Sequence, residues 1–115
     1  MADCIFCRIA AGAIPAKKLY EDDLVVAFHD IQPAAPIHIL VIPKAHVTSL
    51  ASVESAHEAM LGRLLAVGSR LAKEQGCSDG FRTIVNTGRV GRQEVYHLPV
   101  HFLGGPDVLP PMLKH

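Results

Sequence analysis

The sequence predicts one domain of the α+β class, spanning residues 1–115 and built on an antiparallel sheet. The order of the expected elements is segregated, because a hairpin and a further strand precede one long helix and two strands follow it. A βαβ fold would instead alternate strands with helices. A chain of 115 residues is large enough for one hydrophobic core, and at this size burial in a dimer adds useful stability.

Short segments rich in β-favouring residues predict the first three strands. Residues 17–20 and 24–28 flank the acidic turn 21–23, a pattern typical of a hairpin. A third strand is expected over residues 38–42, and Pro43 ends it. The continuous apolar run of this third strand predicts a central, buried position in the sheet.

Two helices are expected. The short one covers residues 4–11, with Asp3 as its N-cap and Gly12 as its terminator. Residues 55–58 have the S-x-x-E form of a capping box, and apolar residues then recur at helical spacing until Gly76. The apolar positions of this long helix cover more than a narrow stripe, which predicts packing on the sheet and on a second subunit. One-sided packing on the core is the alternative.

The last part of the sheet carries the residues with the most chemistry. A fourth strand is expected over residues 82–86 and a fifth over residues 97–102, where the sequence alternates with a period of two. Strand geometry places His97, Pro99 and His101 on one face of this strand. It places the apolar residues Leu98, Val100 and Phe102 on the other face, which is expected to face the core.

Two histidines on one strand face require an explanation, since imidazole titrates near neutral pH and commonly marks chemistry. Next-but-one residues on a strand lie roughly 6.7 Å apart, so imidazoles and the group between them can address one phosphate or metal. The alternative is a pair of hydrogen-bonded histidines that merely cover the sheet. Pro99 lacks a backbone N–H, which confines it largely to strand edges, ends and bulges.

The composition excludes several classes of partner. Eleven lysines and arginines balance eleven acidic residues, and no extended basic surface for nucleic acid or anionic membrane is expected. No stretch approaches the roughly 20 apolar residues that span a bilayer, and the N-terminus lacks a secretory leader pattern. We therefore expect a soluble cytoplasmic protein whose partner is a small molecule.

Three cysteines in such a chain argue against a disulfide framework. Cys4 and Cys7 form a C-x-x-C pair on a first helical turn, a common half of a tetrahedral zinc site that needs two further ligands. The alternatives are a reduced, metal-free pair in the core and a redox pair. The redox alternative is weaker, because such pairs usually follow a strand in a βαβ setting.

Residues 97–105, His-Leu-Pro-Val-His-Phe-Leu-Gly-Gly, resemble the signature of the histidine triad (HIT) family, in its nucleoside phosphoramidase branch. The similarity extends over nearly the whole chain, including residues 14–17, 21–23, 27–31, 42–44, 85–86 and 93–96. The resemblance implies a five-stranded antiparallel sheet with two helices, which dimerises through the long helix and a strand into a continuous sheet. It also implies binding of purine nucleoside monophosphates and hydrolysis of nucleoside 5′-phosphoramidates and related adenylates.

Members of the family attack the α-phosphate with the middle histidine of the triad, and Pro99 stands at that position here. A proline nitrogen is tied up in an amide and cannot act as a nucleophile, whereas an imidazole nitrogen can. The resemblance therefore implies a catalytic site, made of His97, Pro99 and His101, that has lost its covalent step. A non-catalytic nucleotide sensor or interaction scaffold is the alternative function.

The resemblance also assigns the remaining site residues. Asp30 would accept hydrogen bonds from the ribose hydroxyls, with a turn cap as its alternative role. The apolar slot for the base would consist of Ile5, Phe6, Ile9, Phe28, His29 and Ile31. The phosphate side would consist of Asn86, Gln93, Glu94, Val95 and His101. Glu94 replaces a serine of several members and is expected to offer its backbone N–H, while Pro106 stands where a basic residue is common.

For the metal, the resemblance supplies the two ligands that the cysteine pair lacks. Members with this pair bind structural zinc through it together with two histidines, which correspond to His46 and His97 here. A zinc site made of Cys4, Cys7, His46 and His97 is therefore expected. It would leave His101 as the free histidine of the triad stretch.

Overall fold

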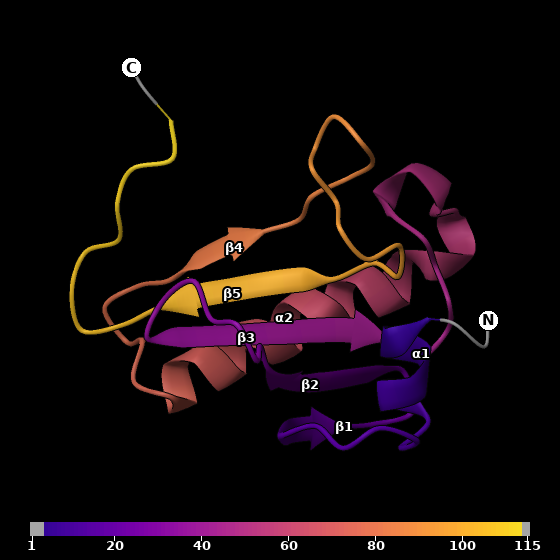
Figure 1. Cartoon of the computed structure of the whole chain (residues 1–115), viewed down its shortest axis with the longest axis horizontal. Helices are drawn as coiled ribbons and strands as arrows, with labels where there is room; N and C mark the ends of the chain where they lie inside the picture. The colour runs from indigo at the N-terminus through magenta and orange to yellow at the C-terminus, as the bar shows by residue number, and fades with distance from the viewer. Residues whose placement is uncertain (1–3, 114–115) are drawn as a thin grey trace.

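Five antiparallel strands form a single sheet in the order β1-β2-β3-β5-β4 (Figure 1). The structure is a computed structural model that describes residues 4–113. Its helices and strands are α1 (Ile5–Ala10), β1 (Lys18–Glu21), β2 (Val25–His29), β3 (Ile37–Pro43), α2 (Glu58–Glu74), β4 (Arg82–Ile84) and β5 (Val100–Gly104). The predicted α+β class, with one short and one long helix, is confirmed.

The central strand β3 pairs with β2 on one side and with β5 on the other. Its side chains alternate between two buried clusters, since Ile39 and Val41 belong to one and Leu40 and Ile42 to the other. A strand that is covered on both faces needs apolar residues at every position. This explains the continuous apolar run and confirms the predicted central position.

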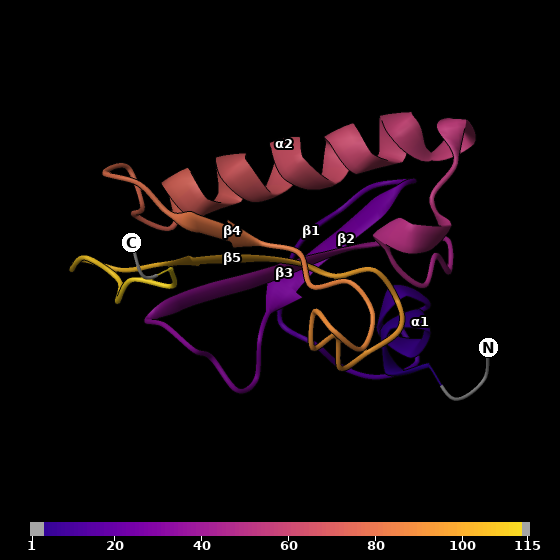
Figure 2. The same ribbon diagram turned by 90° about the horizontal axis from the view of Figure 1, so that it is seen from above.

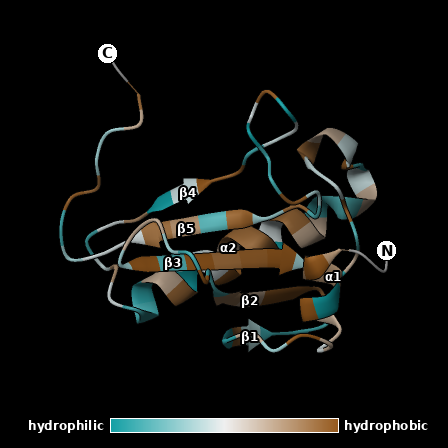
Figure 3. Ribbon diagram, viewed as in Figure 1, coloured by the Kyte–Doolittle hydropathy of each residue, from teal (hydrophilic) through white to brown (hydrophobic). Residues whose placement is uncertain are grey.

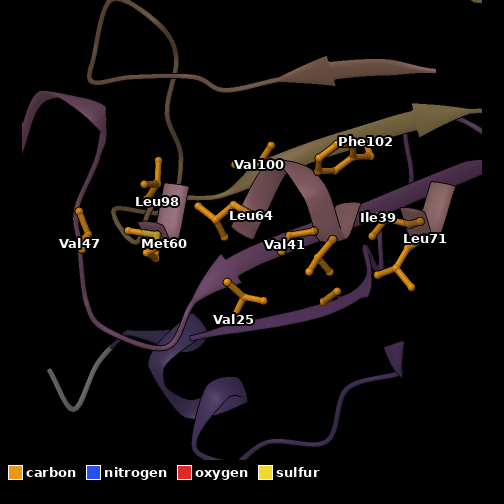
Figure 4. Close-up of a cluster of buried hydrophobic side chains, with 12 residues drawn as sticks. Val25, Ile39, Val41, Val47, Met60, Leu64, Leu71, Leu98, Val100 and Phe102 are labelled. Carbon is orange, nitrogen blue, oxygen red and sulfur yellow. The ribbon is translucent and has the colours of Figure 1, made fainter. Parts of the chain in front are cut away.

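The long helix α2 lies across one face of the sheet (Figure 2). The core between them is formed by twelve buried residues: Val25, Ala27, Ile39, Val41, Val47, Met60, Leu64, Val67, Leu71, Leu98, Val100 and Phe102 (Figure 4). Helix and sheet approach closely at Gly68, where an added Cβ would lie 2.0 Å from the ring of Phe102. Glycine at position 68 is thus a packing requirement of this interface.

The short helix α1 covers the opposite face near one end of the strands (Figure 2). Phe6 and Ile9 pack there against Val26, Phe28, Leu40 and Ile42. The rings of Phe6 and Phe28 meet edge to face with centroids 5.8 Å apart. α1 is thereby fixed against the sheet, and its first turn lies beside the segment that precedes β5.

The start of α2 differs from the sequence prediction. Residues Ser55–His57 form a 3-10 turn, and the helix begins at Glu58 without a capping hydrogen bond from a serine. The reciprocal capping bonds instead join Glu54 and His57, with the Glu54 N–H donating to His57 Nδ1 at 2.9 Å. The S-x-x-E pattern lies one residue out of register, because a histidine ring nitrogen can also accept this bond.

The start of β5 is also later than predicted. The expected strand begins at His97, but β5 begins at Val100, and residues 97–99 form an irregular approach to it. The Leu98 N–H donates to the carbonyl of Val47 outside the sheet, and Pro99 has no N–H to contribute to a ladder. The core assignment is nevertheless confirmed, because Leu98 and Val100 are buried against α2 together with Phe102.

The ends of α1 match the prediction in part. Its N-cap is Cys4, whose Sγ accepts the Cys7 N–H at 3.3 Å, while the expected cap Asp3 lies outside the described residues. The helix ends as predicted, with Gly12 at a φ of +78°.

Hydrophobic residues concentrate on β2 and β3 (Figure 3). These two strands lie between α1 and α2, so their side chains are covered from both faces of the sheet. No helix within residues 4–113 is long and apolar enough to span a bilayer.

Candidate functional site

Four predicted metal ligands come together where α1, the end of β3 and the approach to β5 meet. We call Cys4, Cys7, His46 and His97 the thiol–imidazole cluster. His97 Nδ1 lies 3.3 Å from Cys4 Sγ and 3.4 Å from Cys7 Sγ, and His46 Nδ1 lies 3.2 Å from Cys7 Sγ. A tetrahedral zinc with usual bond lengths would separate its sulfur and nitrogen ligands by about 3.6 Å. The three sulfur–nitrogen separations lie 0.2 to 0.4 Å below this value, so the donor atoms are already gathered around one point where a zinc ion could bind.

The protonation of His97 also suits a metal. Its Nε2 lies 2.7 Å from the carbonyl oxygen of Pro43, which can only accept, so Nε2 carries the proton. The lone pair of Nδ1 consequently points at the two sulfurs. A carbonyl acceptor behind a histidine ligand is a usual means of fixing its tautomer.

Burial acts on both kinds of ligand in this cluster. It lowers the pKa of His97, which is fully buried, and so favours the neutral imidazole that a metal requires. Burial and the neighbouring Cys4 thiol raise the pKa of Cys7. A divalent cation would supply the positive charge that two adjacent thiolates need. The donor set is thus that of a structural zinc site with Cys₂His₂ ligation.

A second group of titratable residues lies on β3, β5 and the loop after β2. We call Asp30, His38 and His101 the carboxylate–imidazole cluster. His38 Nε2 lies 2.9 Å from His101 Nδ1 and 3.5 Å from Asp30 Oδ2. Neighbouring strands bring the rings together, because His38 pairs with Leu103 and His101 with Leu40 in adjacent register.

Burial lowers the pKa values of both imidazoles in this second cluster. The Asp30 carboxylate opposes the effect on each ring, and Glu94 also opposes it on His101. The proximity of the two rings adds a further lowering at His101. Burial therefore favours the neutral form of both imidazoles.

The triad histidines do not address one ligand, contrary to the prediction from their shared strand face. His97 belongs to the thiol–imidazole cluster and His101 to the carboxylate–imidazole cluster. The reason is the irregular backbone before Val100, which releases His97 from the alternation of β5. Pro99, which stands between these two histidines in the sequence, is buried.

A pocket of about 720 Å³ opens beside Asp30 and His38. Its lining comes from the segment before β1 and from the end of β2 with its loop: Pro15, Ala16, Lys17, His29, Asp30, Ile31, Pro33, Pro36 and His38. Three predicted nucleotide-binding residues, His29, Asp30 and Ile31, lie in this lining. Asp30 Oδ1 accepts the Gln32 N–H at 2.8 Å, so this side chain also caps the turn.

The other residues predicted for the base slot divide into two groups. Phe6, Ile9 and Phe28 are buried in the core beneath α1, with at most 8% of each residue exposed. Ile5 and Ile31 are exposed, at 45% and 91%. Of the residues predicted for the apolar slot, Phe6, Ile9 and Phe28 are therefore part of the core, and Ile5 and Ile31 are open to solvent.

Four of the predicted phosphate-side residues lie in the loop between β4 and β5, and the fifth, His101, lies on β5 itself. Gln93 is buried, and its side chain holds this loop together by accepting from the Gly88 N–H and donating to the carbonyls of Thr48 and Val95. Glu94 is exposed and Asn86 is half-buried. The amide of Gln93 is thus committed to the backbone, which makes it a support of the loop in this structure.

Sequence reasoning missed two residues of the site. The sequence pattern places His38 only on a buried strand, although a histidine at the head of an apolar strand is a signal that could have singled it out. Lys17 lines the pocket through its position just before β1, and nothing in the local pattern marks it.

Comparison with known proteins identifies the family. A sequence model of the HIT domain matches residues 11–108, and the chain belongs to the HIT domain family. The purine nucleoside phosphoramidase of Escherichia coli is 46% identical over 114 residues, covering 98% of this chain and 95% of that protein. Protein HitA of Neisseria gonorrhoeae is 50% identical over 106 residues, covering 92% and 99%.

Solved structures agree with this assignment. A histidine triad protein from Clostridium difficile superposes with a TM-score of 0.90 at 46% identity, covering 96% of this chain and 97% of that one. A histidine triad nucleotide-binding protein from Candida albicans gives 0.79 at 31% identity, with 95% and 87% covered. A zinc-bound histidine triad family protein from Mycobacterium smegmatis gives 0.78 at 34% identity, with 89% and 74% covered. The predicted HIT fold is therefore confirmed.

Proposed function

We propose that this chain binds a purine nucleoside monophosphate or a nucleotide conjugate in the pocket beside Asp30 and His38. The observation that carries the proposal is the convergence of predicted ligand contacts on this pocket, with the Asp30 carboxylate and His29 in its lining and His101 adjacent to His38. A carboxylate with free lone pairs suits ribose hydroxyls, and a neutral imidazole suits a phosphate oxygen. The E. coli relative named as a purine nucleoside phosphoramidase supports the substrate class.

We further propose that the hydrolytic step of the family is disabled by Pro99. Transfer of a nucleotide to an imidazole forms a P–N bond while the leaving amine departs with a proton, and water then cleaves the P–N bond. Pro99 has no lone pair for the first step, because its nitrogen belongs to the peptide bond. His97 is directed at the sulfurs of Cys4 and Cys7, which makes it a poor substitute.

The test is turnover of an adenosine phosphoramidate by the chain and by Pro99→His. The unmodified chain should show neither turnover nor a nucleotidyl adduct by mass spectrometry, and Pro99→His should restore both. Loss of a covalent nucleophile typically changes the rate by several orders of magnitude, so the difference should be large. Titration with adenosine or guanosine monophosphate should show saturable binding by both proteins.

Three outcomes would change this assignment. Steady turnover by the unmodified chain that His101→Ala abolishes would show that another nucleophile acts. A Pro99→His variant that folds, binds nucleotide and stays inactive would place a second block in the site, at Glu94 or Pro106. Absence of nucleotide binding in both proteins would contradict the binding proposal itself.

A nucleotide sensor or interaction scaffold is the second candidate function. The observation that favours it is that His38 contacts both Asp30 and His101 even though proline stands at position 99. A binding module needs the pocket and the hydrogen-bond donors but no nucleophile. A histidine codon at position 99 in the source gene would favour the enzyme, and a proline codon the binding module.

We propose structural zinc in the thiol–imidazole cluster, held by Cys4, Cys7, His46 and His97. The geometry of the four donor atoms supports it, as does the zinc-bound relative from M. smegmatis. When bound, zinc would join α1 to the segments after β3 and before β5 and so stabilise the fold. A reducing compartment such as the cytoplasm would keep the thiols available.

We also propose a homodimer that continues the sheet through β4 and packs α2 against its counterpart. β4 is an edge strand, and such a strand offers unpaired backbone groups to a second copy. Leu65 on α2 is 48% exposed, which gives the outer face of the helix an apolar position for such a contact. Sedimentation should give twice the mass of the 12.4 kDa chain, and Leu65→Lys should shift it toward the monomer.

A further inference from the structure

The loop between β4 and β5 closes tightly on itself over residues 87–93. The Gly91 N–H donates to the Thr87 carbonyl at 3.3 Å, and the Gln93 N–H donates to the Gly88 carbonyl at 3.0 Å. An added Cβ at Gly91 would lie 2.6 Å from the Thr87 carbonyl oxygen, so these backbones are in direct contact. The side chain of Gln93 also bonds two backbone carbonyls outside the loop. The loop is therefore held in one shape by its own hydrogen bonds.

This loop carries two arginines. The Arg92 N–H donates to the Arg89 carbonyl at 3.1 Å, so one turn contains both residues. Both side chains are exposed, and Val90 between them is 86% exposed. We call residues 89–92 the arginine turn. It presents two positive charges from a backbone that the surrounding loop holds in place.

The backbone of the arginine turn is strained at Arg92. Its φ is +63°, and it is the one non-glycine residue of the range 4–113 with a positive φ. A Cβ makes this left-handed conformation costly, whereas glycine adopts it readily. Strain of this kind concentrates at functional positions. The side chain of Arg92 is thus the candidate reason for an arginine where glycine would be less strained.

The two guanidinium groups of the turn lack partners within the described chain. Arg63 donates to a carboxylate at 2.6 Å and Arg82 to a backbone carbonyl at 2.7 Å. The side chains of Arg89 and Arg92, in contrast, make no hydrogen bond or ion pair with any residue between 4 and 113. A guanidinium stays charged at neutral pH, and its planar fork matches a carboxylate or a phosphate. The turn can therefore accept an anionic group without first breaking an ion pair.

The arginine turn lies on the same side of the sheet as the carboxylate–imidazole cluster. The loop that contains it, α1 and the loop after β2 all lie on the face opposite α2 (Figure 2). His101 belongs to that face, because its neighbours Val100 and Phe102 pack toward α2. The charge of Glu94, two residues after Arg92, opposes the lowering of the His101 pKa that burial causes. This end of the loop is therefore close enough to the cluster to act on it electrostatically.

We propose that the arginine turn selects nucleotide conjugates whose second half is acidic. Arg89 and Arg92 would bind a carboxylate, phosphate or sulfate of the group that is joined to the nucleotide phosphate. The proposal rests on the proposed nucleotide-binding function and adds a substrate class to it. In that binding mode the nucleoside lies beside Asp30 and the phosphate lies toward His101, so the second half of the conjugate extends toward the loop.

Specificity arises here from repulsion as well as attraction. Two positive charges disfavour a conjugate whose second half ends in an ammonium group, and they favour one that ends in an anion. Each exposed charge pair contributes little, so two pairs should together change affinity by roughly five- to tenfold. Salt should reduce this preference, because exposed charges are screened.

The test uses three adenosine 5′-phosphoramidates that share one linkage and differ in the end group. The amines are β-alanine, β-alaninamide and ethylenediamine, which leave a carboxylate, a neutral amide and an ammonium group. Calorimetric titration of the zinc-loaded chain should give the tightest binding for the carboxylate and the weakest for the ammonium group. The ratio of these two affinities should approach one as the salt concentration rises from about 0.05 M to about 0.5 M.

Substitution of the arginines should remove this preference. In the double variant Arg89→Gln/Arg92→Gln the three affinities should agree within about twofold, while adenosine monophosphate should bind nearly as in the parent chain. Lys73→Gln is the matched control, because Lys73 is an exposed cation near the end of α2, on the other side of the sheet. It changes the net charge equally and should leave the preference intact.

Two substitutions at position 92 separate charge from backbone shape. Arg92→Gly fits the φ of +63° and removes the guanidinium, so the preference should fall although the loop keeps its conformation. Arg92→Lys keeps a positive charge and should retain most of the preference. A preference that survives unchanged in Arg92→Gly and in the double variant would overturn the proposal.

The remaining outcomes distinguish this proposal from the function on which it rests. Equal affinity of the parent chain for the three conjugates would overturn the proposal and leave nucleotide binding intact. An equal loss for all three in the double variant would show that the arginines shape the loop without choosing the ligand, which would also overturn it. If neither the conjugates nor adenosine monophosphate bind, the proposed function fails and this proposal fails with it.

Discussion

Each of the two clusters contains two imidazoles, and one backbone group in each orients a ring in the opposite sense. In the thiol–imidazole cluster the Pro43 carbonyl takes the proton of His97 Nε2 and turns the Nδ1 lone pair toward the sulfurs. In the carboxylate–imidazole cluster the Ala34 N–H occupies the lone pair of His38 Nδ1 and turns a proton toward His101. A carbonyl thus favours a metal ligand and an N–H favours a donor.

The backbone atom behind an imidazole is therefore as informative as the residues in front of it. Either cluster consists of three or four potential ligands within 4.8 Å of one another. The hydrogen bond on the far ring nitrogen decides whether the near nitrogen presents a lone pair or a proton. Three experiments would test this contrast between the clusters.

The largest effect should come from removing the metal of the thiol–imidazole cluster. The purified chain should contain about one zinc per chain by elemental analysis, and Cys4→Ser should lose it. A ligand present at a thousandfold excess over its Kd stabilises by about 4 kcal/mol, so loss of this order in the free energy of unfolding is expected. The measurement is denaturant unfolding with and without a chelator.

Cys77→Ala is the matched control for this experiment. Cys77 is buried beside Gly104, away from the cluster, and its loss should leave the zinc content unchanged. A zinc content near zero in protein never exposed to a chelator would contradict the site. Loss of zinc in Cys77→Ala but not in Cys4→Ser would mean that the ligands were wrongly chosen.

A smaller effect is expected in the carboxylate–imidazole cluster from Asp30→Ala. This substitution should weaken the binding of adenosine or guanosine monophosphate by about 1 to 3 kcal/mol, the range for loss of hydrogen bonds to a charged acceptor. The zinc content should stay the same, because Asp30 belongs to the other cluster. Calorimetric titration and elemental analysis measure the two quantities on one sample.

Asp30→Asn separates the two roles of this side chain. Its amide oxygen can still accept the Gln32 N–H and hold the turn, but the negative charge is gone. If Asp30 binds the ribose as a carboxylate, both variants should bind weakly. Wild-type affinity in Asp30→Asn with weak binding in Asp30→Ala would mean that Asp30 only caps the turn.

The smallest effect concerns the pH dependence of stability. Burial lowers the pKa values of His38 and His101 in the folded chain below about 6.5, the value for an unfolded histidine. As the pH falls through about 6.5, the unfolded chain binds protons that the folded chain does not, so stability is present above that pH and is lost below it. Each histidine contributes at most about 1.4 kcal/mol per pH unit.

His38→Gln should therefore flatten the fall in the free energy of unfolding between pH 7 and pH 5. Unfolding of both proteins at equal zinc concentration gives the difference that belongs to this cluster. An unchanged slope would mean that His38 titrates normally in the folded chain, contrary to its burial at 7% exposure.

Much of the fold follows from local patterns. The apolar run of β3, the hairpin before it and the terminating Gly12 and Gly76 each reflect a constraint that acts within a few residues. The cysteine pair and the motif over residues 97–105 likewise indicate a metal site and the family through residue identity and spacing. With relatives at 46% and 50% identity, the family can be assigned from residue identity alone.

Other features depend on distant segments that meet only in the folded chain. Residues 97–99 do not pair as a strand because the Leu98 N–H bonds to Val47, about fifty positions away in the chain, instead of to a neighbouring strand. The resemblance predicts Gln93 on the phosphate side, yet its side-chain amide donates hydrogen bonds to the carbonyls of Thr48 and Val95. Hydrogen-bond partners of this kind depend on the approach of separate backbones, which no local pattern encodes.

The sequence by itself determined the α+β fold, the buried faces and the identity of the potential ligands, because periodicity and residue chemistry act locally. Only the tertiary structure decided how those ligands are divided, sending His97 to the cysteines and His101 to His38. It also decided the ring protons, since the Pro43 carbonyl and the Ala34 N–H reach their histidines through folding alone. The direction of a hydrogen bond is a property of the assembled backbone, and that direction distinguishes the thiol–imidazole cluster from the carboxylate–imidazole cluster.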